Sequence, residues 1–158
     1  MKRLLNIRDA TKELNILRSL KGYTSPFEVV GAYRLIDDGS RPEATVIIKT
    51  DNQEMHEAST GVGPVDALAN VLKKSLASIF PAIQAVKLVD FSSRIHEAKS
   101  GTAAQVEVSI IFTDSRKIWS VVAISANINM ASFLALLDGF EYAILSEVPE
   151  SKNPDEQG

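Results

Sequence analysis

The chain has 158 residues, which corresponds to one domain, since domains usually contain about 100–200 residues. Hydrophobic residues make up 45% and charged residues 23%, both ordinary for a globular protein, so disorder of the whole chain is excluded. The net charge of −3 argues against a surface for nucleic acid, which needs clustered basic residues. The absence of Cys excludes disulfides, thiolate zinc sites and iron–sulfur clusters, and two His cannot supply an all-imidazole zinc site.

The sequence favours a protein of the cytoplasm. We find no run of about 18 apolar residues, and therefore predict no transmembrane helix. The basic residues at the start are not followed by the apolar run of about 7–15 residues that a signal peptide contains. With no Cys and no export signal, we expect a cytoplasmic location and no membrane partner.

The first half of the chain predicts a short helical segment followed by three strands and a helix. Leucine and isoleucine residues between 4 and 20 predict the N-terminal helical segment, which we bound at 1–25. Alternating and β-branched residues predict strands at 27–36, 43–49 and 54–60. Apolar residues on one helical face predict a helix at 65–76, with Pro64 suited to its first position.

The second half repeats this order. Strands are predicted at 86–95, 103–112 and 117–124, and a helix from about 129 to 145. Ala44 then corresponds to Ala104, and Ala67 to Ala131. The predicted fold is therefore α+β, with two β-β-β-α units at about 26–82 and 83–147. The units should pack together or against a second copy, because one three-stranded unit cannot cover its own apolar face. The polar residues 148–158 are predicted to be a disordered tail.

The most specific local feature is the turn Gly61-Val62-Gly63-Pro64 before the first predicted helix. Glycines allow close approach to the backbone, and the first turn of a helix presents unpaired N–H groups. Together they suit a small anion such as a carboxylate. A nucleotide loop is excluded, because no Lys-Ser/Thr pair follows and no third glycine completes a dinucleotide motif. A tight turn that only leads into the helix explains the same residues.

A small enzyme is a weaker hypothesis. It would use His56 with Asp66 or Asp90, which would have to lie within about 2.6–3.2 Å or one water of each other. His56 is explained more simply as a strand residue, and Asp66 as an acidic residue that a helix N-terminus favours. We find no metal-ligand spacing, and predict no catalytic residue, metal or cofactor.

Several motifs in one order resemble a known family. Residues 61–67, 88–91 and 101–104 are similar to the C-terminal regulatory domain of α-isopropylmalate synthase and citramalate synthase. Residues 117–128 and 140–142 look more like the citramalate branch, and the resemblance covers roughly 27–145. It implies a dimeric, non-catalytic domain of two β-β-β-α units that binds an end-product amino acid as feedback inhibitor. Isoleucine is the inhibitor in the citramalate branch and leucine in the other. The catalytic part of such enzymes is a TIM barrel, for which this chain is too short. Either the chain is a fragment excised from such an enzyme, or it is a free-standing product that could bind a separate catalytic synthase subunit.

The resemblance also implies a ligand site. Its residues would be Gly63, Val65, Asp66, Leu88, Phe91, Ile95, Thr102, Ala104, Asn127 and Ile128. The ligand carboxylate would lie at helix amides, its ammonium near Asp66, and its branched side chain against the apolar members of this set. Val62, where the family often has Asn, and Phe91, where it usually has Tyr, favour an alternative, as do the glycines missing before the last helix. That alternative is a dimerisation or protein-interaction module without a small ligand.

Overall fold

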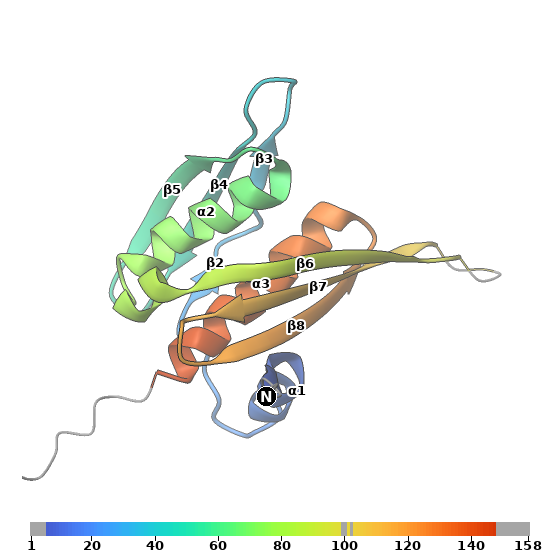
Figure 1. Cartoon of the computed structure of the whole chain (residues 1–158). Coiled ribbons are helices and arrows are strands. Elements are labelled where there is room, and N and C mark those ends of the chain that lie inside the picture. Colours follow the sequence, from blue (N-terminus) through green and yellow to red (C-terminus); the bar gives the residue numbers. More distant parts are fainter. Residues whose placement is uncertain (1–5, 99–100, 102, 148–158) are drawn as a thin grey trace, which may run out of the picture.

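A computed structural model describes residues 6–98, 101 and 103–147 of the chain. It contains two sheets and a central pair of helices, which confirms the predicted α+β class with its β-β-β-α pattern (Figure 1). The predicted tail, 148–158, and the candidate ligand residue Thr102 lie outside the described residues.

Each sheet belongs mainly to one half of the chain. In the order of their pairing, the strands of sheet A are β1 (Ile7–Asp9), β8 (Ile118–Ser125), β7 (Gln105–Thr113) and β6 (Lys87–His96). Those of sheet B are β2 (Glu28–Val29), β3 (Arg34–Ile36), β4 (Glu43–Lys49) and β5 (Glu54–Thr60). Strand β4 pairs with β5 along one edge and with both β2 and β3 along the other. The strands β6, β7 and β8 are antiparallel, and β6 is an edge strand.

The helices α2 (Pro64–Ala77) and α3 (Ile128–Leu145) pack against each other between the sheets. Helix α2 covers β4 and β5, and α3 covers β7 and β8. Both helices begin on the same side of the molecule (Figure 1). The short 3₁₀ helix η1 (Pro81–Ala85) then leads from α2 into β6.

Helix α3 corrects one expectation from the sequence. By length and composition, its 18 residues are apolar enough to cross a bilayer, although we predicted no such stretch. More than half of the helix is buried inside the fold, which is typical of the core helix of a soluble protein. A helix that is apolar all round is expected in either setting.

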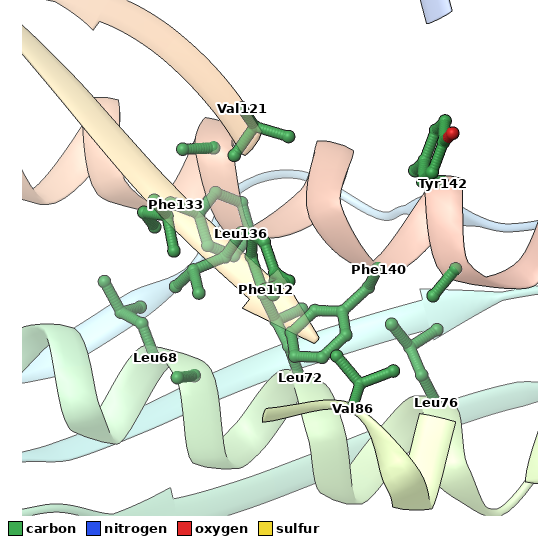
Figure 2. Packing of buried hydrophobic residues seen from close by; sticks show 14 of the residues in the cluster. Leu68, Leu72, Leu76, Val86, Phe112, Val121, Phe133, Leu136, Phe140 and Tyr142 are labelled. Atoms are coloured by element: carbon green, nitrogen blue, oxygen red, sulfur yellow. The ribbon is translucent and has the colours of Figure 1, made fainter. Parts of the chain in front are cut away.

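The core lies between the two sheets, where α2 packs on β4 and β5, α3 packs on β7 and β8, and the two helices pack on each other. Three leucines of α2, at positions 68, 72 and 76, point toward the aromatic side chains of Phe112 and Phe140 (Figure 2). The rings of Phe112 and Phe140 lie 5.8 Å apart in an edge-to-face arrangement. Leucines every four residues form one helical face, so the predicted periodicity of this helix is confirmed.

The internal repeat is visible in how the two helices begin. The N–H of Ala67 donates to Gly63 O at 2.9 Å, and the N–H of Ala131 donates to Asn127 O at 3.0 Å. Both alanines are buried at the fourth position of their helix, as their predicted equivalence requires. The other predicted pair is not equivalent. Ala44 is buried within β4, whereas Ala104 is exposed one residue before β7 begins.

The strand predicted at 27–36 is divided into β2 and β3. Glu28 pairs with Lys49, but Arg34 pairs with Thr45, so two extra residues lie between the halves. Gly31 lies in this interruption with a φ of 76°, a left-handed conformation that glycine adopts without strain. Apolar residues continue through the interruption, which explains why the sequence indicated one strand.

A bulge in β6 decides which of its side chains share a face. Leu88 pairs with Phe112 and Asp90 with Ile111, so Val89 is an extra residue in the ladder. Without the bulge, Leu88 and Phe91 would lie on opposite faces, because side chains alternate along a strand. With it, Phe91 pairs with Ile110 and shares the face of Leu88.

The N-terminal segment adds a strand as well as the expected helix. Residues of β1 pair in parallel with the start of β8, which the sequence did not indicate. Helix α1 (Ala10–Arg18) follows directly, with the carboxylate of Asp9 accepting a hydrogen bond from Lys12 N at 3.0 Å. This cap explains where the helix begins. Helix α1 then packs beside β8 and α3.

Candidate functional site

The two glycines of the turn before α2 have different roles. A Cβ on Gly61 would lie 2.3 Å from the backbone nitrogen of Ala67, so only glycine allows this close approach. A Cβ on Gly63 would meet no atom within 4 Å. Gly63 is the N-cap of α2 in an extended conformation, and its position supplies no side-chain cap. The packing of Gly61 supports the turn interpretation, while Gly63 leaves open space at the helix start.

The first turn of α2 offers backbone donors to an anion. Pro64 has no N–H, and the first intrahelical bond is donated by Ala67, which leaves the N–H groups of Val65 and Asp66 at the helix start. The helix dipole adds a partial positive charge there. A carboxylate could accept hydrogen bonds from both groups.

Asp66 also braces the turn itself. Its Oδ2 accepts a hydrogen bond from Val62 N at 2.9 Å, and Asn70 Nδ2 lies 3.5 Å from the same oxygen. Asn70 donates a second bond to Thr60 O at 3.0 Å. The Asp66 side chain is exposed and remains within reach of solvent. Its carboxylate therefore has a structural role whether or not a cationic group binds beside it.

Helix α3 begins differently. The Oδ1 of Asn127 accepts a hydrogen bond from Met130 N at 2.8 Å and caps the helix. This cap occupies one of the donors that the equivalent position of α2 leaves available. Ile128, the first residue of α3, is an exposed apolar side chain. Of the two helix starts, that of α2 is the one without a side-chain cap.

An apolar strip runs along β6 on the face that α3 covers in the neighbouring strands. It consists of Leu88, Phe91 and Ile95, which are 37%, 36% and 71% exposed. In β7, the residues opposite the first two, Phe112 and Ile110, are fully buried. Strand β6 has no strand on its outer edge within the described part of the chain. An uncovered apolar face beside an unpaired edge is a typical interaction surface.

Within one chain, the described residues of the sequence-predicted ligand site lie at the start of α2, along β6, just before β7 and at the start of α3. Gly63, Val65 and Asp66 lie at the start of α2. Leu88 lies near the start of β6, which follows the other end of α2 after the short helix η1. Fourteen residues of helix, about 20 Å, separate them. Strand β6 then runs back toward the side where the helices begin (Figure 1). Ala104 lies exposed just before β7, which pairs with this strand.

The residues of the enzyme hypothesis lie on separate elements. His56 is exposed on β5, Asp90 is exposed on β6 of the other sheet, and Asp66 bonds to Val62 and Asn70. His96 lies 3.3 Å from Glu107, which also pairs with Arg94. Among the described residues, no group of three or more His, Cys, Asp or Glu side chains is placed to hold a metal ion.

A polar cluster at the end of α3 was missed by sequence analysis. Glu141 is buried, and its Oε2 accepts hydrogen bonds from the phenol of Tyr23 at 2.5 Å and from Arg18 at 3.3 Å. The next residue, Tyr142, donates from its hydroxyl to Glu13 at 3.0 Å. No sequence signal joins these residues, because more than 100 positions separate the two sides.

The environment of this cluster shifts its pKa values. Burial, reinforced by the hydrogen bond to Glu141, raises the pKa of Tyr23 to about 12. The hydrogen bond from Arg8, 2.7 Å long, lowers the pKa of Glu13. Burial raises the pKa of Tyr142, and its hydrogen bond to Glu13 adds to this. At neutral pH both phenols are therefore donors, and Glu13 is an ionised acceptor.

A duplicated α+β unit with an uncovered edge strand and an open helix start defines a small domain suited to assembly and regulation. The family comparison makes this specific: residues 12–144 match the model of the LeuA allosteric (dimerisation) domain. The chain belongs to this family.

Among the individual relatives, (R)-citramalate synthases support the predicted resemblance to the citramalate branch. The chain is 38% identical over 142 residues to an (R)-citramalate synthase of Geobacter sulfurreducens, covering 86% of this chain and 27% of that protein. It is 35% identical over 148 residues to an (R)-citramalate synthase of Aquifex aeolicus, covering 90% and 28%. A 2-isopropylmalate synthase of Trichodesmium erythraeum is 35% identical over 124 residues, covering 73% and 20%. The chain spans about a quarter of the length of these relatives, and corresponds to their regulatory domain and not to a whole synthase.

Proposed function

We propose that this chain is a non-catalytic regulatory domain that binds a branched-chain amino acid as the feedback effector of a citramalate-synthase-type enzyme. Isoleucine is the favoured ligand and leucine the next. The observation that carries the proposal is the apolar strip of Leu88, Phe91 and Ile95, which is exposed although its partners Phe112 and Ile110 in β7 are fully buried. We expect the domain to act in the cytoplasm on the catalytic part of a synthase, which is either a separate subunit or the rest of a longer chain.

The polar end of the ligand has a suitable place at the start of α2. Its carboxylate would accept hydrogen bonds from the N–H groups of Val65 and Asp66, over the open space beside Gly63. Its ammonium would lie near the exposed carboxylate of Asp66. Charge-assisted hydrogen bonds of this kind are stronger than neutral ones.

The aliphatic end of the ligand would lie against the strip on β6 and against Ile128. Burying a branched side chain contributes about 1.5–3 kcal/mol. Because the strip and the α2 turn form two groups within one chain, we expect a second copy to complete the site. A dimer with two-fold symmetry would bring each group of one protomer toward the other group of its partner.

A second candidate function is dimerisation without a small ligand. It is favoured by Asp66 and Asn127, which already hold the turn and cap α3 within the chain. It is also favoured by Val62, which is 81% exposed where the family often has Asn. In this case the strip would serve only as a contact between copies.

A thermal-shift titration with isoleucine, leucine and valine separates the two functions. At about 100 times its dissociation constant, a ligand adds about 2.7 kcal/mol to stability, which corresponds to about 5–10 °C in Tm for a chain of this size. A saturable increase with isoleucine supports the effector function. If none of the three amino acids raises Tm and the protein sediments as a stable dimer, the ligand-free dimerisation function is supported instead.

The variant Gly63→Ala sharpens this test. Its Cβ enters space that no described atom occupies, so the fold should be unchanged, while the proposed carboxylate position is narrowed. We expect an unliganded Tm only a few degrees below that of the wild type, because alanine is a poorer N-cap than glycine, and a smaller shift with isoleucine. The control Val62→Ala alters an exposed side chain of the same turn and should keep the shift. An unchanged isoleucine shift in Gly63→Ala would place the ligand elsewhere.

A further inference from the structure

The N-terminal residues 7–23, which we call the strap, are attached to the fold in an unusual way. They comprise β1, α1 and the turn that follows. The strap packs on β8 and α3, which belong to the second repeat unit, whereas the chain after it continues into β2 of the first (Figure 1). The strap therefore covers an edge of sheet A, although the chain that follows it enters sheet B.

Few apolar groups hold the strap in place. Within it, Ala10 and Leu14 are the apolar residues fully buried, while Ile7, Ile16 and Leu20 remain about half exposed. A pocket of about 590 Å³ lies between α1 and the end of α3, lined in part by Leu17 and Leu145. This pocket is open to solvent, so part of the surface that α1 shares with α3 is not covered by packed side chains.

The remaining attachments of the strap are polar. Strand β1 pairs with the first half of β8, and Thr11 Oγ1 then accepts a hydrogen bond from Val122 N at 2.8 Å. Arg18 pairs with Asp138 at 2.8 Å and with Glu141 at 3.3 Å. Arg18 is 37% exposed and Asp138 21%, so solvent screens the pair between them and it contributes only modestly to stability.

Two neighbouring residues of α3 contact α1 and the turn after it near their two ends. One of them accepts a hydrogen bond from the strap, and the other donates one to it. The carboxylate of Glu141 accepts from the phenol of Tyr23, beyond the end of α1. The phenol of Tyr142 donates to the carboxylate of Glu13, in the first turn of α1. These two bonds bracket the helix, and we call them the latch.

We propose that the strap opens as a unit from an otherwise intact domain, and that the latch controls how often it does so. Segments with few buried apolar contacts open locally at a lower free energy than global unfolding requires. Opening would uncover the second edge of sheet A, along β8, and the C-terminal half of α3. The strap thus acts as a cover over an edge that could otherwise accept another strand.

The lack of Cys in the chain allows a direct test by thiol labelling. Ala10→Cys places one thiol in the strap, and Ala44→Cys places one in β4; both alanines are 0% exposed. We expect the thiol at position 10 to be labelled at least about tenfold faster than that at position 44, because only global opening exposes the latter. Equal labelling rates at the two positions would overturn the proposal.

The latch is tested in the same two backgrounds. Tyr23→Phe and Tyr142→Phe each remove one hydroxyl, and each should accelerate labelling at position 10 about tenfold. Because each bond exists only in the closed state, its loss lowers the free energy of local and of global opening alike, so labelling at position 44 should rise by a similar factor and remain the slower of the two. The third tyrosine provides the control. Tyr33 packs on Phe133 with ring centroids 4.9 Å apart, away from the strap, and Tyr33→Phe should leave position 10 unchanged. If either latch variant leaves labelling at position 10 at the rate of Ala10→Cys alone, the latch does not control how often the strap opens.

Hydrogen exchange of the unmodified chain gives a second readout that requires no substitution. The amides of α1 should exchange through local opening, with weaker denaturant dependence than those of β7 at the centre of sheet A. Exchange of α1 only by global unfolding would contradict the proposal even if a cysteine variant failed to fold.

Discussion

The phenol of Tyr23 donates a 2.5 Å hydrogen bond to the carboxylate of Glu141, 118 residues further along the chain. Glu141 is 7% exposed and also pairs with Arg18, so a buried carboxylate near the end of α3 is satisfied by the N-terminal segment. Buried carboxylates without partners are strongly destabilising. The N-terminal segment is therefore part of the packing of the regulatory domain, although it precedes both repeat units.

Alkaline unfolding should show the contribution of Tyr23. Its pKa is raised from 10.0 to about 12, mainly by burial and then by the bond to Glu141. Folding therefore favours the protonated phenol, and this contribution is fully present below pH 10 and is lost as the pH rises from 10 to 12. We expect the unfolding free energy of the wild type to fall more steeply over this range than that of Tyr23→Phe. Parallel curves from urea titrations at each pH would contradict this.

Gly61→Ala should destabilise the domain more than Gly63→Ala does. The new Cβ at position 61 would lie within 3 Å of the backbone of Asp66 and Ala67. Because backbone cannot rotate away as a side chain can, we expect a loss of about 1–3 kcal/mol in urea unfolding. The matched variant at position 63 meets no clash and should cost less, about 0.5–1 kcal/mol, because alanine is a poorer N-cap than glycine. Equal stability of the two variants would show that the turn can shift.

Gly139→Ala should perturb the core where α3 meets β7. A Cβ at position 139 would lie 2.1 Å from the ring of Phe112, which stacks on Trp119 at 5.9 Å between centroids. We expect a loss of about 2–3 kcal/mol and a change in the fluorescence of the single tryptophan. Adding Phe112→Leu should then cost less than it does in the wild type, since both substitutions act on one contact. Additive effects in this double-mutant cycle would argue against that contact.

The apolar strip of β6 should control self-association. Phe91→Ser replaces a 36% exposed ring whose pairing partner Ile110 is buried in sheet A. We expect the dimer dissociation constant to rise at least about tenfold, because aromatic side chains dominate such interfaces. Ile36→Ser on β3, at an apolar position that is 55% exposed, is the control and should leave the constant unchanged. Sedimentation velocity over a dilution series measures both; a wild-type constant in Phe91→Ser would place the interface elsewhere.

Much of the fold could be predicted from the sequence because it depends on local signals. The four-residue spacing of leucines in α2 and the alternation in β7 are encoded within a few turns or pleats. The candidate site was only partly accessible in this way. The turn at Gly61 and Gly63 was evident, but which glycine is required by packing depends on the distance to Ala67. The capping role of Asn127 likewise depends on the orientation of its side chain.

The sequence by itself determined the α+β class, the duplicated unit and the family, because periodicity and turn residues are local and the family motifs occur in a fixed order. Only the tertiary structure decided that Leu88 and Phe91 share a face, since one extra residue at Val89 reverses the alternation and leaves no compositional trace. It also decided that Tyr23 meets Glu141. Such contacts depend on which surfaces of the folded chain come together, and spacing along the chain carries no information about them.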